Sequence, residues 1–446
     1  MSIRKILSFA LCVAMLFTVM TSLTACNVVE EETPDPTDAP TTTSTPTTKP
    51  TAVPTTKVTK KPSPSNNDNN TTVDENDVTA FDLDKFLYPV WADNISYAEA
   101  AFVRENENGG IDPIQLLYPI DEIVSVRSAD LKTLYKNGED YTIEDGKLVI
   151  LSEGKIPVLA YDDFCFELTT ENYDNNATKL PAVDKPGYGY IRAEIGANKP
   201  GMSAWTLAVT YTHSTESVVT VPETKSLVFK NLLNKIAKGE EVKIVSTGDS
   251  ITYGWSASGT VGLEPKCPQY NLLVEQFIEK NYGIPVTQTN VGVSGSTSSG
   301  GVSKLNEICA EKPDLVIIAF GMNDGGGVTP SAFVNNINTM VSTIERNCPE
   351  AVIVVVGTAL PNEKIAWSIG GSPALNYHDD YPEALMEAEE EWKNAAFANV
   401  TQANIDLYAR KVYEDLAGSN SNHPNDYMHR IYAQVILKTI FGEYYV

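Results

Sequence analysis

From Glu241 onward, short apolar runs alternate with longer segments of mixed polarity. Several of these runs are almost solid Val and Ile, which is typical of strands buried on both faces. Strands that alternate with helices run parallel and are joined by right-handed crossovers. We therefore predict a three-layer α/β/α domain with strands at Val242–Val245, Val286–Val291, Leu315–Phe320, Ala351–Val356 and about Val400–Leu407.

The segments between these strands have the length and apolar spacing of helices. An earlier segment, Lys225–Lys238, has Leu and Ile at helical spacing and Gly239 just beyond its end, as a C-cap would be. It would lead the chain into the α/β domain, which we place at residues 225–446. The other candidate helices lie near Gln269–Tyr282, Val302–Glu311, Pro330–Arg346 and Tyr381–Phe397.

The first strand of this domain is followed by Gly248, Asp249 and Ser250 and then by a helix-compatible segment. A serine at the carboxyl end of a parallel strand lies where open α/β sheets bind ligands. An ordinary turn after a strand fits the same three residues, because short motifs often occur by chance. We interpret Ser250 as a candidate nucleophile.

Later polar segments supply what acyl transfer needs besides a nucleophile. A hydroxyl needs a base to take its proton, and histidine suits that task near neutral pH, so His423 is the candidate base. A tetrahedral oxyanion needs fixed donors. The candidates are the backbone N–H groups of Ser250 and Gly295 and the Asn323 side-chain amide, and glycine at position 295 permits close approach. The segments are Asn290–Gly295, Gly321–Asp324 and Asn422–Asp426.

Taken together, the four segments resemble the SGNH (GDSL) hydrolase family, and the resemblance covers roughly Glu241 to Val446. It implies a flavodoxin-like fold and hydrolysis of O-esters or thioesters without a metal or another cofactor. It also implies that Ser250 is the nucleophile and His423 the general base. Gly295 and Asn323 would complete the oxyanion hole with the Ser250 N–H.

One position departs from the family pattern. The family usually has an aspartate three residues before the histidine, holding the imidazole in place, and here that residue is Asn420. The alternatives are a Ser–His dyad oriented by a backbone carbonyl or by the Asn420 amide oxygen, or an acid from elsewhere, with Asp415 and Asp426 the nearest. A rival alignment uses Asp426 and His429, which have the family spacing. The proline after His423 favours His423.

The amino terminus has the pattern of a secretory signal, with two basic residues and then an apolar stretch. The following Leu23–Cys26 resembles a bacterial lipobox. This implies removal of residues 1–25, lipidation of Cys26 and a location at the outer face of the cell membrane. An ordinary signal peptide or an uncleaved anchor is the alternative. Residues 26–77 are rich in Thr, Pro and Asn and predict a disordered linker.

Residues 78–224 are β-rich, without a long helical period. Asp145 and Gly146 stand between two β-rich runs, which indicates a hairpin, and Trp205–Thr212 alternates like a half-buried strand. We predict a small β-sandwich before the α/β domain. Its role is glycan binding, a lid over the site, or simple packing, and packing is the default expectation.

The charge balance narrows the class of partner. The chain has 33 Lys and Arg against 58 Asp and Glu, a net charge of −25, and no basic cluster outside the signal segment. This argues against nucleic acid and against anionic lipid surfaces. The four cysteines after Cys26 lack zinc-site spacing, so we predict no metal site.

The order of the two regions, a β-domain before an SGNH-like domain, resembles some carbohydrate esterases. The leading hypothesis is therefore an extracellular serine esterase acting on O-acetyl groups of a polysaccharide. One rival is a lysophospholipase or thioesterase on the same scaffold. The other is a glycan-binding surface lipoprotein whose α/β domain has lost its activity, which Asn420 would favour.

Overall fold

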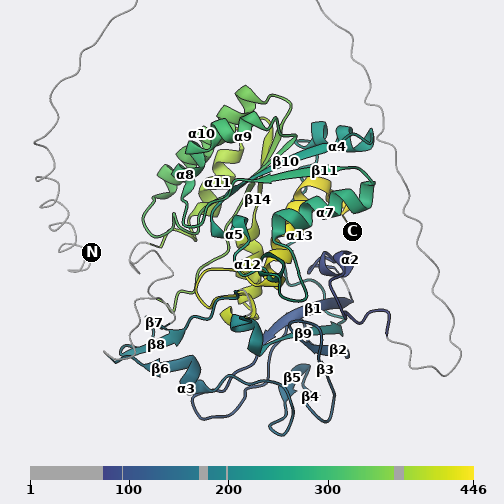
Figure 1. The fold of residues 1–446 in the computed structure, drawn as a ribbon, viewed down its shortest axis with the longest axis vertical. Coiled ribbons are helices and arrows are strands. Elements are labelled where there is room, and N and C mark those ends of the chain that lie inside the picture. The colour runs from purple at the N-terminus through teal and green to yellow at the C-terminus, as the bar shows by residue number, and fades with distance from the viewer. Residues whose placement is uncertain (1–73, 93, 170–178, 197–198, 366–375, 446) are drawn as a thin grey trace, which may run out of the picture. The chain divides into compact units, whose positions relative to one another are not determined.

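The computed structural model describes residues 74–92, 94–169, 179–196, 199–365 and 376–445 (Figure 1). The signal peptide, Cys26 and almost all of the linker at 26–77 lie outside these residues, so these remain predictions. Within the described residues, no helix has the length and apolar character needed to cross a membrane.

The α/β region is built on a parallel sheet whose described strands run in the order β11-β10-β12-β13-β14. This is the 2-1-3-4-5 order of flavodoxin-like folds, so the predicted fold class is confirmed. The order reverses between β10 and β12, and the carboxyl ends of these two neighbouring strands flank the place where such sheets bind ligands. The strands are β10 (Val242–Gly248), β11 (Val286–Asn290), β12 (Leu315–Ala319), β13 (Val352–Val356) and β14 (Ala395–Ala398).

Helices cover both faces of this sheet (Figure 1). Ile244 and Ile317 belong to the core on the side of α7, α12 and α13, whereas Val245 and Ile318 belong to the core on the side of α10 and α11. Both faces are buried, which explains the runs of Val and Ile. The helices are α4 (Lys230–Ala237), α5 (Ser250–Tyr253), α6 (Ser258–Val261), α7 (Tyr270–Tyr282), α8 (Ser298–Ser303), α9 (Leu305–Ala310), α10 (Pro330–Asn347), α11 (Tyr381–Glu389), α12 (Val400–Tyr408) and α13 (Asp426–Phe441), with short 3-10 turns η3 (Tyr413–Asp415) and η4 (Gly442–Tyr444).

The last strand is not where the sequence predicted it. Val400–Leu407 lies in helix α12. The strand is β14, which overlaps the end of the segment predicted as a helix at Tyr381–Phe397. Asn399 caps α12 by accepting a hydrogen bond from the Gln402 N–H, and the buried residues of α12 recur at helical spacing. Strand β14 is mostly alanine, which has a low strand propensity, and it is a strand because it pairs with β13.

The helix predicted at Tyr381–Phe397 ends at Glu389, as α11, and two further predicted helices are shorter or divided. The helix predicted at Val302–Glu311 is two helices, α8 and α9, which meet at Lys304. The helix predicted at Lys225–Lys238 is confined to α4, which begins at Lys230, and Gly239 follows it with a φ of +73°. The predictions at α7 and α10 agree with the structure to within one residue.

Antiparallel sheets make up the β-rich region, while its description as a sandwich stays a prediction. The hairpin at Asp145 and Gly146 is confirmed, because both residues have positive φ and join two paired strands. Strand β9 is buried along almost its whole length, since it lies between β1 and β2. The elements are α2 (Leu83–Phe86), β1 (Ile95–Phe102), β2 (Glu122–Ser128), β3 (Leu134–Tyr135), β4 (Tyr141–Glu144), β5 (Lys147–Ile150), α3 (Tyr161–Phe164), β6 (Cys165–Glu167), β7 (Lys179–Pro181), β8 (Tyr188–Ile191), η1 (Gly201–Trp205) and β9 (Thr206–Thr212).

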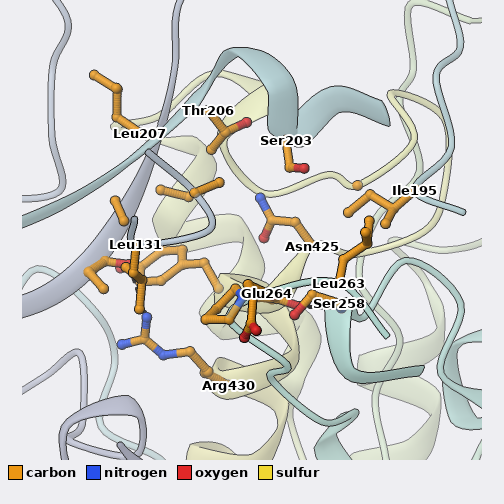
Figure 2. Close-up of a pocket in the computed structure, with 18 of the residues that line it drawn as sticks. Leu131, Ile195, Ser203, Thr206, Leu207, Ser258, Leu263, Glu264, Asn425 and Arg430 are labelled. Atoms are coloured by element: carbon orange, nitrogen blue, oxygen red, sulfur yellow. Dashed lines mark hydrogen bonds between the residues drawn. The ribbon is translucent and has the colours of Figure 1, made fainter. Parts of the chain in front are cut away.

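The β-rich region and the α/β region share one hydrophobic core, which includes residues from both. The buried Arg430 of α13 donates hydrogen bonds to the backbone oxygens of Phe86, Tyr97 and Ala98. The carboxylate of Asp415 accepts one from the Phe102 N–H. A cavity of about 60 Å³ lies at this junction (Figure 2). The two regions are therefore bonded through buried polar groups as well as apolar packing.

Candidate active site

Ser250 lies at the point where β10 ends and α5 begins, beside the reversal in strand order. Asp249 caps the helix, accepting a hydrogen bond of 2.9 Å from the Ile251 N–H. A Cβ atom on Gly248 would come within 2.4 Å of the Ala319 carbonyl oxygen, so only glycine permits the close approach of β10 and β12 here. Ser250 is thus held at a rigid strand end.

The Ser250 hydroxyl is paired with His423. The distance from Ser250 Oγ to His423 Nε2 is 2.9 Å, and both residues are buried. The loop that carries His423 is held by its own backbone, because the Gly418 N–H donates to the His423 carbonyl over 2.8 Å. The structure therefore brings the predicted nucleophile and base within hydrogen-bonding distance, the geometry that activation of a serine requires.

Hydrogen bonds connect the loop that contains Gly295 to the end of β10 and to the side chain of Asn323. The Val293 N–H donates to the Gly248 carbonyl over 3.0 Å, which fixes the loop that contains Gly295. The Asn323 side-chain amide donates to the Ser296 carbonyl in the same loop over 2.9 Å. Gly295 has a φ of +77°, which favours glycine. Among the described residues, no acceptor is bonded to the Ser250 or Gly295 N–H, so both are available to a developing oxyanion.

His378 supports the loop that carries Asn323. Its Nε2 lies 2.9 Å from the Met322 carbonyl oxygen, and its ring fills the space that a side chain at Gly325 would need. Burial lowers the pKa of the His378 imidazole, which favours the neutral form. This histidine is structural, and its role is to brace the neighbour of Asn323.

The carboxylate beside His423 is one that the sequence did not predict. Glu194 follows strand β8 in the β-rich region, and its Oε1 lies 2.9 Å from His423 Nδ1. A carboxylate only accepts, so the imidazole donates from Nδ1 and presents the lone pair of Nε2 to the Ser250 hydroxyl. No motif surrounds Glu194. The signal in the sequence was the missing aspartate at position 420, for which an acid from elsewhere was one of the alternatives.

The predicted orienting residues do not contact the imidazole. The Asn420 side chain donates to the Ile191 carbonyl over 2.9 Å and accepts from the Asn362 amide. Asp426 lies in the first turn of α13 and accepts a hydrogen bond from the Ser258 N–H. Burial raises the pKa of the Asp426 carboxyl to about 6. Asp415 is turned toward strand β1. The alternatives based on these three residues are therefore wrong.

The rival alignment with His429 also fails in the structure. His429 is fully buried in α13, stacks on the Tyr270 ring and has its Nε2 3.2 Å from the Trp255 carbonyl oxygen. The Trp255 side chain is 40% exposed and stacks against the His423 ring, with centroids 5.7 Å apart. It therefore forms a wall beside the Ser250–His423 pair.

Burial and charge set the ionisation of the two carboxyl groups nearest this pair. Burial raises the pKa of Asp249 to about 7, although the cap hydrogen bond from the Ile251 N–H acts to lower it. Burial also acts to raise the pKa of Glu194, but the hydrogen bond and charge of His423, with Arg192 and Ser256, outweigh it and hold the pKa below its ordinary value. Glu194 is thus the ionised carboxylate of the site. Within the described residues, no group of three or more His, Cys, Asp or Glu side chains is placed to hold a metal ion.

Restoring the family's aspartate at position 420 should lower activity. The Asn420→Asp variant loses the donor that binds the Ile191 carbonyl and places two acceptors face to face in a buried site. We expect kcat/KM to fall, together with a loss of about 1–3 kcal/mol in the free energy of unfolding. Ester hydrolysis and chemical denaturation, each compared with wild type, measure the two effects. A rise in activity would show that an aspartate at 420 reaches His423.

A parallel α/β domain with a hydrogen-bonded serine and histidine at the reversal of its strand order has the architecture of a serine hydrolase. Residues 247–431 match the GDSL-like Lipase/Acylhydrolase family. The matched family is the one that the four sequence segments resemble.

Several known proteins are similar to this chain. Esterase TesA of Pseudomonas aeruginosa is 32% identical over 132 residues, which are 29% of this chain and 60% of TesA. A two-domain esterase active on acetylated mannans, crystallised with mannopentaose, is 21% identical with a TM-score of 0.38 over 49% of this chain and 54% of that one. The acetylxylan esterase Axe2 of Geobacillus stearothermophilus is 22% identical with a TM-score of 0.36 over 46% of this chain and 95% of Axe2. The chain thus spans less than two thirds of TesA and of the mannan esterase.

Proposed function

We propose that this protein is a serine esterase that hydrolyses O-acyl esters, with O-acetyl groups on a polysaccharide as the expected substrate. The observation that carries the proposal is the 2.9 Å contact between Ser250 Oγ and His423 Nε2. His423 takes the serine proton, Ser250 attacks the ester carbonyl, and the N–H groups of Ser250 and Gly295 with the Asn323 amide stabilise the oxyanion. The imidazolium then gives this proton to the oxygen of the leaving alcohol as its bond to the acyl carbon breaks, which leaves the acyl-enzyme. Water gives a proton to His423 and attacks the acyl group, and the proton returns to Ser250 as the acid leaves. The esterase activity named for TesA supports this chemistry.

A polar cavity beside the His423 loop supports a sugar substrate. It has a volume of about 320 Å³. Its wall includes Asn362 and Glu414. Asn362 donates a hydrogen bond to the Asn420 carbonyl. Tyr413, the neighbour of Glu414 in the sequence, donates one to the Ser421 carbonyl. The cavity therefore adjoins the segment that leads to His423. Aromatic rings and polar groups line it together, a combination that suits the apolar faces and hydroxyl groups of sugars.

The long acyl chain of a lipid would need an apolar groove beside Ser250. The polar cavity, whose lining includes neither Ser250 nor His423, has many charged and amide groups in its wall, among them Arg104, Asp184 and Asn362. These groups favour a polysaccharide over the lysophospholipase or thioesterase alternative. The place of action, at the outer face of the membrane through a lipidated Cys26, is part of the same proposal and rests on the sequence alone.

The test is the release of acetate. The purified full-length chain is incubated with acetylated xylan, acetylated mannan, an acetylated monosaccharide and a long-chain acyl ester of p-nitrophenol. We expect acetate release from at least one polysaccharide, with a kcat/KM at least ten-fold above that for the monosaccharide, because the polar cavity binds sugar units beyond the acetylated one. The Ser250→Ala variant is the matched control for hydrolysis by contaminants.

Each other result changes the assignment. Turnover of the long-chain ester alone moves the substrate to lipids and contradicts the role given to the polar cavity. Equal rates on the polysaccharides and the monosaccharide contradict extended sugar binding. No turnover of any ester, with polysaccharide still bound in an affinity gel, contradicts the esterase proposal and favours a glycan-binding protein.

A further inference from the structure

The segment Ile191–Ile195, here called the acid arm, leaves the β-rich region and reaches His423. Glu194 stands in this arm and makes three polar contacts. Its Oε1 lies 2.5 Å from an Arg192 guanidinium nitrogen and 2.9 Å from His423 Nδ1, and its Oε2 accepts from the Ser256 hydroxyl over 3.0 Å. Both carboxylate oxygens are therefore held, and one of them faces the imidazole nitrogen that points away from Ser250.

The acid arm is anchored at both of its ends. At one end, the Ile191 carbonyl accepts from the Asn420 amide. At the other, the Ile195 side chain is buried in the cavity at the junction, close to Ser258 and Asn425 of the α/β region (Figure 2). Gly201 packs on the backbone between these ends, because a Cβ there would lie within 2.6 Å of the Glu194 carbonyl oxygen. Glu194 is thus fixed by the fold and does not rely on its own side-chain contacts alone.

On the α/β side, two of the residues that contact the acid arm have unusual backbones. Ser256 has a φ of +64° and Asn420 a φ of +59°. Left-handed conformations are costly for residues other than glycine and persist where the surrounding structure imposes them, often at functional sites. Here they direct the Ser256 hydroxyl to the carboxylate and the Asn420 amide to the Ile191 carbonyl. Asn420 occupies the position where the family usually has its acid. Here it holds the acid arm, which carries the carboxylate of Glu194.

We propose that Glu194 is the positioning residue of the reaction, the acid of a Ser250–His423–Glu194 triad whose third member comes from the β-rich region. This inference rests on the proposed esterase function. Glu194 holds the imidazole with its proton on Nδ1 and stabilises the imidazolium that forms when Nε2 takes the serine proton. The β-rich region is therefore part of the active site, beyond the packing role that the sequence predicted.

Two replacements of Glu194 separate charge from orientation. Arg192 only donates, so in Glu194→Gln the amide oxygen must keep the position beside Arg192 and His423, with the amide nitrogen facing the Ser256 hydroxyl. This variant loses the charge and retains the orientation. Glu194→Ala loses both. The matched control is Glu139→Gln, which removes one carboxylate from an exposed pair with Lys136 in the same region.

The measurements are the pH profile of kcat/KM and the tautomer of His423. We expect kcat to fall on the order of 10²–10⁴-fold in Glu194→Ala and about ten-fold in Glu194→Gln, with wild-type rates in Glu139→Gln. In Glu194→Gln the low-pH limb should move to lower pH, because a neighbouring negative charge favours the protonated imidazole. The chain has 4 histidines, so ¹⁵N spectra compared with those of His423→Ala assign the His423 signals. These should show a protonated Nδ1 in wild type and a mixture of tautomers in Glu194→Ala.

The outcomes distinguish this inference from the proposed function. An active wild type with equal rates, profiles and tautomers in both Glu194 variants overturns the triad and leaves the esterase proposal in place. A wild type that hydrolyses no ester contradicts the esterase proposal. The His423 tautomer then decides the role of Glu194, because unchanged ¹⁵N signals in Glu194→Ala overturn it. If Glu194→Ala does not fold, Glu194→Gln decides, since it keeps the hydrogen bonds that hold the acid arm.

Discussion

Replacing Ser250 with alanine should abolish ester hydrolysis and leave the protein folded. Among the described residues, the Ser250 hydroxyl is the oxygen hydrogen-bonded to His423 Nε2, and the variant removes it. Removal of a triad nucleophile costs on the order of 10⁴–10⁶-fold in kcat, and donors that remain in an oxyanion hole supply the residual rate. The measurement is steady-state hydrolysis of the best ester from the substrate panel.

Stability and active-site labelling are the controls for Ser250→Ala. Within the described part of the chain the hydroxyl has one hydrogen-bond partner. Its loss should therefore cost about 1 kcal/mol in the free energy of unfolding, read from a denaturant titration. A fluorophosphonate should add its mass to the wild type and leave Ser250→Ala unmodified. A variant that keeps more than a tenth of the wild-type rate would show that another group attacks the ester.

Replacing His423 with alanine should be almost as damaging as the loss of Ser250. Without the imidazole, no described group accepts the serine proton, and nucleophile and base act as a unit. We expect kcat to fall on the order of 10⁴-fold or more, with KM changed only a few-fold, because His423 acts on the serine proton. Steady-state kinetics on the same ester checks this result.

His429→Asn is the matched control, because His429 belongs to the rival alignment and does not touch Ser250. Its kcat should stay within about ten-fold of wild type, whereas stability should fall, since the variant disturbs a buried contact with the Trp255 carbonyl. A larger loss of kcat in His429→Asn than in His423→Ala would favour the rival alignment.

The pH dependence of stability gives a second check on His429. Burial lowers its pKa to about 4, below the value of about 6.5 for an unfolded histidine. The unfolded chain therefore binds a proton on this imidazole between about pH 6.5 and 4 while the folded chain does not, so wild-type stability should fall as the pH falls through that window. In His429→Asn, this part of the loss should be absent. An unchanged slope would mean that His429 is not buried as a neutral group.

The elements that sequence alone predicted well have strong local signals. Strands β12 and β13 are unbroken apolar runs, and α10 begins with the cap Thr329 followed by proline. Strand β14 and helix α12 were exchanged because alanine carries little strand preference, whereas the β-branched Val400 and Thr401 favour strands. Pairing with β13, a tertiary contact, decided that assignment.

The sequence by itself determined the fold class and indicated the pair Ser250 and His423, together with Gly295 and Asn323 as the expected donors. These residues stand in short motifs, and the first three motifs follow strands whose carboxyl ends meet at one edge of a parallel sheet, so local pattern and topology were enough. Only the tertiary structure decided which carboxylate faces His423. Glu194 and His423 are 229 positions apart. No periodicity or spacing links a lone glutamate in the β-rich region to a histidine in a loop of the α/β region. The packing of the acid arm against Ser256 and Asn420 brings them together, and packing between distant segments is the property that a single sequence does not display.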